Sequence, residues 1–124
     1  MKPTFLIIED NEQNLYLATF LLEQNGYKVA AARSGPEGIT LAGEIIPDLI
    51  ILDIQLPLMD GYAVARALRE NPTLENVPIV AVTSYAMVGD RERTIAAGCT
   101  GYIEKPINPE TFISQIENYL NTET

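Results

Sequence analysis

Short runs of consecutive apolar residues alternate along the chain with longer segments in which apolar positions recur every three or four residues. The short runs have the length of strands, and several are apolar throughout, as is typical of parallel strands covered on both faces. The runs occupy residues 5–8, 29–32, 49–52, 79–82 and 101–103. The segments between and after them have the period of amphipathic helices and occupy residues 14–24, 37–45, 62–68, 89–97 and 111–120.

This alternation of five strands with five helices predicts a three-layer, doubly wound α/β domain with a five-stranded parallel sheet. Right-handed crossovers leave few topologies, and one of them is the flavodoxin-like strand order 2-1-3-4-5. The functional crevice of such a sheet lies at the carboxyl ends of its strands. Gly26 is expected to end the first helix, while Asn108 caps the last helix and Pro109 lies in its first turn.

The composition of the chain disfavours several classes of function. The 124 residues suit one domain, and the net charge of −9 disfavours nucleic acid or membrane partners, whose phosphates require clustered cations. The chain has no histidine, and its single cysteine, Cys99, is expected to be a buried thiol in a reducing compartment, the cytoplasm. Neither a secretory signal nor an apolar stretch long enough to span a membrane occurs in the sequence.

Polar side chains follow four of the predicted strands. Glu9 and Asp10 follow the first strand, Asp53 the third, Thr83 the fourth and Lys105 the fifth. These strands are neighbours in the predicted order, so their carboxyl ends meet at one edge of the sheet. The sequence therefore predicts a site with three carboxylates, a hydroxyl and an ammonium group.

Three carboxylates gathered in this way repel one another. Two like charges about 4 Å apart cost about 4 kcal/mol at an effective dielectric of roughly 20. Either one carboxylate takes up a proton, or a cation completes the site. Oxygen ligands without Cys or His favour Mg²⁺, for which Mn²⁺ could substitute. Alternatively, Glu9 and Asp10 only cap the first helix, but Asp53 and Lys105 at matching strand ends argue against this reading.

Asp53 is the candidate nucleophile of the predicted site. Beside Mg²⁺ and Lys105 it is expected to stay ionised, and aspartate carboxylates form acyl phosphates in several enzyme classes. The metal would neutralise charge on a transferred phosphoryl group, while Lys105 and the Thr83 hydroxyl would contact its oxygens. The alternatives are an ordinary strand residue for Thr83 and a solvated charge for Lys105.

The order and spacing of these residues resemble one family. The residues that carry the resemblance are Glu9-Asp10, Asp53, Pro57, Gly61, Thr83 and Lys105-Pro106. Together they resemble the receiver domain of two-component response regulators, the CheY-like superfamily, over nearly the whole chain. The resemblance implies that Asp53 accepts phosphate from a histidine kinase or a histidine phosphotransfer protein. It also implies a signalling switch rather than an enzyme.

The resemblance further assigns the metal ligands and the switch residues. Asp10, Asp53 and the main-chain carbonyl of Gln55 would bind Mg²⁺ directly, with Glu9 acting mostly through water. Thr83 and Tyr102 would form the switch pair, in which Tyr102 turns inward when the Thr83 hydroxyl is drawn to the phosphate. The alternative for Tyr102 is a half-buried strand aromatic.

Three further features follow from the resemblance. The Lys105-Pro106 peptide bond is expected to be cis. Gln55 and Tyr85 stand two positions after the phosphoacceptor and the switch hydroxyl, where side chains tune access of water to the acyl phosphate. The docking face would comprise the fourth helix, the fifth strand and the fifth helix. Its candidate contacts are Ala86, Met87, Val88, Arg91, Arg93 and Tyr102.

Within the family, the segments EDNEQN and VTSYAMVGD are most similar to DivK-type single-domain regulators and to receivers of hybrid histidine kinases. The first resemblance implies one receiver domain over residues 1–124, with no output domain, that acts by docking to a downstream protein as a monomer or a weak phosphorylation-dependent dimer. The second implies a receiver domain of a hybrid kinase or a phosphorelay intermediate.

Other classes of protein fit the residues less well. A phosphatase with an aspartyl-phosphate intermediate usually carries a second acid two residues after its nucleophile, where this chain has Gln55. A flavin or nucleotide carrier would need a phosphate-binding loop after the first strand, but EDNEQN is acidic. A pseudo-receiver that takes no phosphate would normally have lost one of the key residues, all of which are present.

Overall fold

The structure is a computed structural model and describes residues 3–56, 58–84 and 88–120, without the side chains of residues 88–90. Its sheet has the order β2-β1-β3-β4-β5, and every pair of neighbouring strands is parallel. The strands are β1 (Thr4–Ile8), β2 (Lys28–Ala32), β3 (Leu49–Asp53), β4 (Ile79–Thr83) and β5 (Gly101–Glu104). The predicted flavodoxin-like strand order is confirmed.

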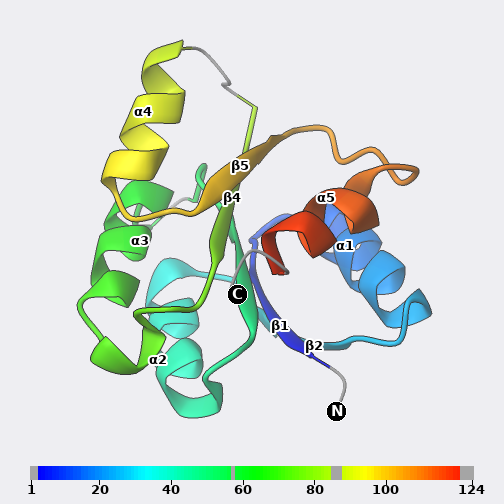
Figure 1. Cartoon of the computed structure of the whole chain (residues 1–124), viewed down its shortest axis with the longest axis horizontal. Coiled ribbons are helices and arrows are strands. Elements are labelled where there is room, and N and C mark those ends of the chain that lie inside the picture. The colour runs from blue at the N-terminus through cyan, green and yellow to red at the C-terminus, as the bar shows by residue number, and fades with distance from the viewer. Residues whose placement is uncertain (1–2, 57, 85–87, 121–124) are drawn as a thin grey trace.

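Helices cover both faces of the sheet, which gives the predicted three layers (Figure 1). One face carries α1 (Glu12–Gln24) and α5 (Phe112–Leu120). The other carries α2 (Gly35–Ile45), α3 (Gly61–Arg69) and α4 (Val88–Ala96), with a short 3-10 helix, η1 (Pro72–Leu74), after α3. None of the helices in the described part of the chain has the length and apolar character needed to cross a membrane.

The core consists of two apolar clusters, one on each face of the sheet. In β1, Phe5 and Ile7 pack toward α1 and α5, whereas Leu6 and Ile8 pack toward α2 and α3, because successive strand residues point to opposite faces. Every residue of β3 and β4 is buried. This double coverage explains why the central strands are apolar throughout and directs attention to Asp53, the charged residue at the end of β3.

The helices begin and end at local capping residues. Asn11 and Asp60 cap α1 and α3, each accepting a hydrogen bond of 2.9 Å from a main-chain N–H of the first turn. Gly26, at φ +86°, ends α1 as predicted. The expectation for Pro109 is wrong: α5 begins at Phe112, and Pro109 lies in the preceding turn, where the Asn108 carbonyl accepts from the Phe112 N–H at 2.9 Å.

Arg69, half-buried at the end of α3, joins this helix to the loops at the opposite end of the strands from the candidate site. The Arg69 guanidinium donates to the carbonyls of Leu74, Val77 and Gly98, each at 2.8 Å. Cys99 lies buried beside it, as predicted, and burial raises the pKa of its thiol to about 11. This thiol is therefore a packing residue of the core rather than a nucleophile.

Candidate functional site

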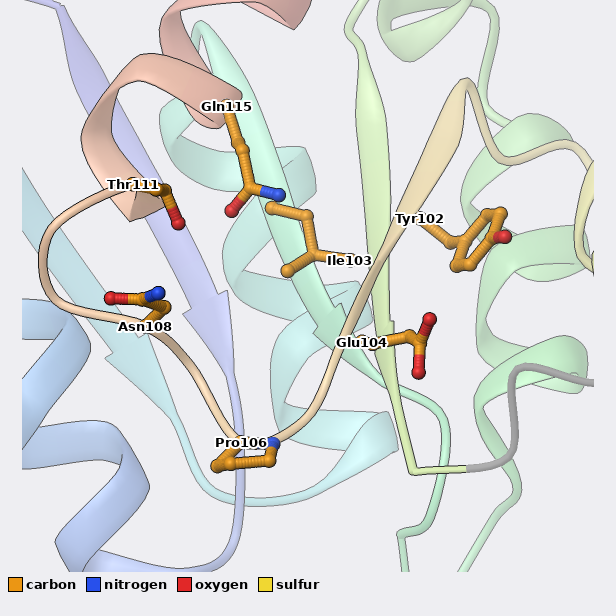
Figure 2. Close-up of a pocket in the computed structure, with 7 residues that line it drawn as sticks. All are labelled: Tyr102, Ile103, Glu104, Pro106, Asn108, Thr111 and Gln115. Carbon is orange, nitrogen blue, oxygen red and sulfur yellow. The ribbon is translucent and has the colours of Figure 1, made fainter.

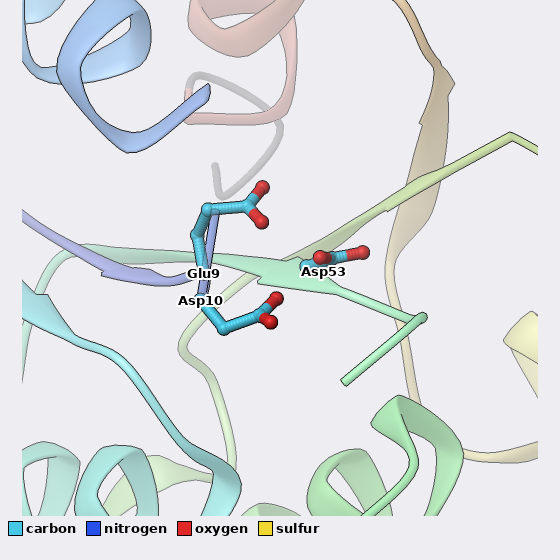
Figure 3. A group of neighbouring side chains, drawn as sticks. All are labelled: Glu9, Asp10 and Asp53. Carbon is cyan, nitrogen blue, oxygen red and sulfur yellow. The ribbon is translucent and has the colours of Figure 1, made fainter. Parts of the chain in front are cut away.

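Three carboxylates meet at the carboxyl ends of β1 and β3. Glu9 and Asp10 directly follow β1, and Asp53 is the last residue of β3, the strand paired with β1. One carboxylate oxygen from each residue lies within 4.8 Å of the others (Figure 3). The structure thus brings together the acidic residues that the sequence places at neighbouring strand ends.

The Asp53 carboxylate is buried and held by two donors. Its side chain is 2% exposed, and Oδ1 accepts hydrogen bonds from Lys105 Nζ at 2.8 Å and from the Gln55 main-chain N–H at 2.9 Å. The Lys105 side chain is itself only 17% exposed, so this ion pair lies largely out of water. Lys105 directly follows β5, and the Lys105-Pro106 peptide bond is cis, as expected.

Glu9 is the carboxyl of this cluster whose pKa is raised by its surroundings. It is 5% exposed, and burial raises its pKa to about 8, with further increases from a hydrogen bond to Asp53 and from the charge of that residue. The main-chain N–H of Asn11, 3.2 Å from Glu9 Oε2, lowers the pKa by a smaller amount. A proton on Glu9 relieves the repulsion within the cluster.

The hydroxyl of Thr83 lies at the end of β4 and is tied to the loop after β3. Thr83 is 2% exposed, and its Oγ1 accepts from the Gln55 side-chain Nε2 at 3.0 Å. The other end of the same amide, Oε1, accepts from the main-chain N–H of Ser84 at 3.3 Å. The sequence singled out Gln55 for its carbonyl and for access of water, but it gave no signal for this side-chain bridge to β4.

The loop that follows Asp53 is folded back tightly onto the strand end. Gly61 donates its N–H to the Ile54 carbonyl at 2.9 Å. A Cβ at Gly61 would lie 2.4 Å from Ile54 Cα and 2.8 Å from the Asp53 carbonyl oxygen, both of them main-chain atoms. Only glycine fits there, so the position of the loop beside Asp53 depends on Gly61.

The predicted docking face is described in part. Tyr102 is half-buried in β5 on the side of α3 and α4, and Arg91 Cζ lies 5.6 Å from its ring centroid. Arg93, which the sequence also offers as a charge on this face, has its Cζ 4.2 Å from the ring centroid of Tyr62 in α3. Outside the described residues lie Tyr85, Ala86, Met87 and the side chain of Val88.

A shallow pocket of about 270 Å³ lies beside β5 and the start of α5 (Figure 2). Glu104 and Tyr102 lie on one side of the strand, and Ile103 and Gln115 lie on the other. The lining residues are Tyr102, Ile103, Glu104, Pro106, Asn108, Thr111 and Gln115. None of the three carboxylates lines this pocket, so it belongs to the surface near α5 rather than to the acidic site.

The chemistry of the donor set fits a magnesium ion. Glu9, Asp10 and Asp53 offer hard oxygen ligands without nitrogen or sulfur, which favours Mg²⁺ or Mn²⁺ over softer metals.

Comparison with known proteins identifies the class to which this fold and site belong. The profile of the response regulator receiver domain matches residues 5–117. The chain belongs to this family and is a receiver of two-component signalling, as the sequence motifs implied. Membership of this family sets aside the phosphatase and the flavin or nucleotide carrier as explanations of the fold and its acidic site.

Comparison with individual proteins shows which receivers this chain resembles. The chain is 45% identical to the polar-differentiation response regulator DivK of Brucella ovis over 120 residues, which cover 97% of this chain and 98% of the relative. Chemotaxis protein CheY4 of Vibrio cholerae has a similar structure, with a TM-score of 0.92 and 27% identity, covering 96% of this chain and 99% of that one.

A third relative carries the metal. The receiver domain of the sensor histidine kinase PA1611 from Pseudomonas aeruginosa PAO1 has a TM-score of 0.90 and 30% identity, covering 98% of this chain and all of that one (100%). In that protein a magnesium ion is coordinated in the active-site cleft.

Proposed function

We propose that Asp53 is the phosphoacceptor of this receiver. Its carboxylate attacks the phosphorus of a phosphohistidine on a histidine kinase or histidine phosphotransfer protein. An oxygen–phosphorus bond forms, the nitrogen–phosphorus bond breaks, and the leaving imidazole takes up a proton. The observation that carries the proposal is the buried Asp53 carboxylate, oriented at Oδ1 by Lys105 and the Gln55 N–H within a cluster of three acids.

The neighbouring residues prepare Asp53 for this reaction. Lys105 holds the carboxylate and stays close enough to contact a phosphoryl oxygen. Glu9, Asp10, Asp53 and the Gln55 main-chain carbonyl are the proposed ligands of Mg²⁺ or Mn²⁺. When bound, the cation supplies charge neutralisation for the phosphoryl group. Burial raises the pKa of Glu9 to about 8, so below that pH the carboxyl must lose its proton before it can act as a ligand of the cation.

The proposed output is a change in protein docking. Thr83 and Tyr102 form the switch pair, and the α4-β5-α5 face binds a downstream protein. Support comes from Thr83 at the end of β4 and from the contact of Tyr102 with Arg91 of α4. A role in a hybrid kinase or as a phosphorelay intermediate is the second candidate, because the PA1611 relative is itself part of a sensor histidine kinase.

Three further features belong to this proposal. They are the cytoplasmic location, the docking partners and the monomeric or weakly dimeric state. The single buried thiol supports a reducing compartment, and the histidine phosphodonors of two-component systems supply the expected partners.

The test is the intact mass of the protein after incubation with acetyl phosphate, with and without Mg²⁺. The wild-type protein should gain one phosphoryl group in the presence of Mg²⁺, and Asp53→Asn should gain none. Asp60→Asn is the matched control, since Asp60 lies near the site in sequence and its cap on α3 is retained by asparagine. A phosphoryl adduct on Asp53→Asn equal to that on the wild type would refute the assignment.

A further inference from the structure

The side chain of Gln55 has a partner at each end of its amide, and both partners lie at the end of β4. Nε2 donates to Thr83 Oγ1 at 3.0 Å, and Oε1 accepts from the Ser84 N–H at 3.3 Å. Through its own main-chain N–H, the same residue also donates to Asp53 Oδ1 at 2.9 Å. Gln55 therefore links the acceptor carboxylate to the two groups that end the neighbouring strand.

The orientation of this amide follows from its partners. The Ser84 main-chain N–H can only donate, so the amide end that faces it must be the oxygen. The opposite end must then be the NH₂ group, which donates to the Thr83 oxygen. With the amide reversed, two donors would meet at Ser84, and that hydrogen bond would be lost.

A phosphoryl group on Asp53 would compete with the Gln55 amide for the Ser84 N–H. It brings strong acceptor oxygens to the edge of the sheet where β3 and β4 end. In the unphosphorylated protein the Ser84 N–H donates to Gln55 Oε1, and the neighbouring Thr83 hydroxyl oxygen accepts from Gln55 Nε2, so the Gln55 side chain holds both residues. The Gln55 amide and the phosphoryl group cannot both keep the Ser84 N–H as a full partner.

We propose that the Gln55 side chain is a latch that holds Thr83 and Ser84 in the unphosphorylated position and must release the Ser84 N–H when Asp53 is phosphorylated. The inference rests on the proposed function of Asp53. It differs from tuning of water access, because the latch acts before the phosphoryl group arrives and sets how readily the switch turns on. Gln55 is thus a positioning residue for the switch.

The test compares beryllofluoride binding, in the presence of Mg²⁺, between the wild type and Gln55→Met. Methionine keeps the length of the side chain but removes both amide hydrogen bonds, while the main-chain N–H to Asp53 is unchanged. The affinity should rise about fivefold, which corresponds to roughly 1 kcal/mol, the usual net value of such hydrogen bonds. Gln55→Asn, too short to reach both partners, should change the affinity in the same direction.

A second readout isolates the latch from a general structural effect. In the metal-free, unphosphorylated protein, the Ser84 amide should exchange with solvent faster in Gln55→Met than in the wild type, measured by NMR. Beryllofluoride should shift the Gln55 side-chain amide signals of the wild type. The matched control is Gln24→Met, an exposed glutamine at the end of α1, which should change neither readout.

The outcomes separate the latch from the function on which it rests. If the wild type binds beryllofluoride but Gln55→Met shows the same affinity and the same Ser84 exchange, the latch is wrong and the phosphoacceptor stands. If the wild type binds no beryllofluoride, or if Asp53→Asn binds it equally well, the proposed function is refuted, and the latch, which depends on it, is refuted too.

Discussion

The buried carboxyl of Glu9 should make the stability of the metal-free protein fall as pH rises. Burial raises the pKa of Glu9 to about 8 in the folded chain, against an ordinary value of 4.5 in the unfolded chain. The folded state therefore holds the proton more tightly, and unfolding releases it between these two values. The contribution of Glu9 to stability is fully present below pH 4.5 and is lost as pH rises through about 8.

The structure gives the size of this effect. A tenfold change in proton affinity is worth about 1.4 kcal/mol, and after solvent screening the shift corresponds to an effect on the order of a few kcal/mol between the acidic and alkaline limits. Glu9→Gln keeps the shape of the side chain but has no proton to lose. The unfolding free energy of this variant should match that of the wild type near pH 4.5. At pH 8.5 it should exceed the wild-type value by roughly a few kcal/mol.

The assay is urea unfolding with EDTA at several pH values between pH 4.5 and pH 8.5. The quantity to plot is the difference in unfolding free energy between the variant and the wild type, because other titrating groups largely cancel from it. Glu23→Gln, on the exposed side of α1, should give a difference that does not change with pH. Excess Mg²⁺ should flatten the Glu9 curve, since a cation favours the ionised carboxylate. A Glu9→Gln difference that stays constant with pH would refute the reasoning.

Three other predictions follow from particular contacts. Gly61→Ala should cost about 1–3 kcal/mol in urea unfolding and slow phosphorylation of Asp53, because its Cβ would meet main-chain atoms; wild-type values for both would contradict the tight loop. Arg69→Met should lower the unfolding free energy by about 2–4 kcal/mol, since three carbonyls lose a charged donor; a loss below that range would mean that water replaces the guanidinium. Arg91→Glu should weaken partner binding in a pull-down while acetyl phosphate still modifies Asp53; unchanged binding would move the interface elsewhere.

The fold was predictable because its signals are local and repeated. The short apolar runs that became β3 and β4 have the length and composition of strands buried on both faces, and the periodic segments between strands have the pattern of helices that cover a sheet. The strand order then brought Glu9, Asp53 and Lys105 to one edge without any knowledge of side-chain positions. The start of α1 was placed two residues late, because the cap Asn11, rather than apolar periodicity, determines where it begins.

The sequence could not predict contacts that depend on the directions in which flexible side chains point. Arg91 and Arg93 are two residues apart on α4, so they lie over different rings, Tyr102 and Tyr62. The bridge from Gln55 to Thr83 joins residues 28 positions apart through a side chain with several rotatable bonds. No pattern in the sequence determines such a contact.

The most direct test of the central claim is to find which residue carries the phosphoryl group. Protein incubated with acetyl phosphate and Mg²⁺ would be treated with borohydride, which reduces an aspartyl phosphate to homoserine, and then digested and sequenced by tandem mass spectrometry. Homoserine at position 53, and unreduced Glu9 and Asp10, is the predicted result. Homoserine at position 10, or a reduced Glu9 with Asp53 intact, would contradict the account.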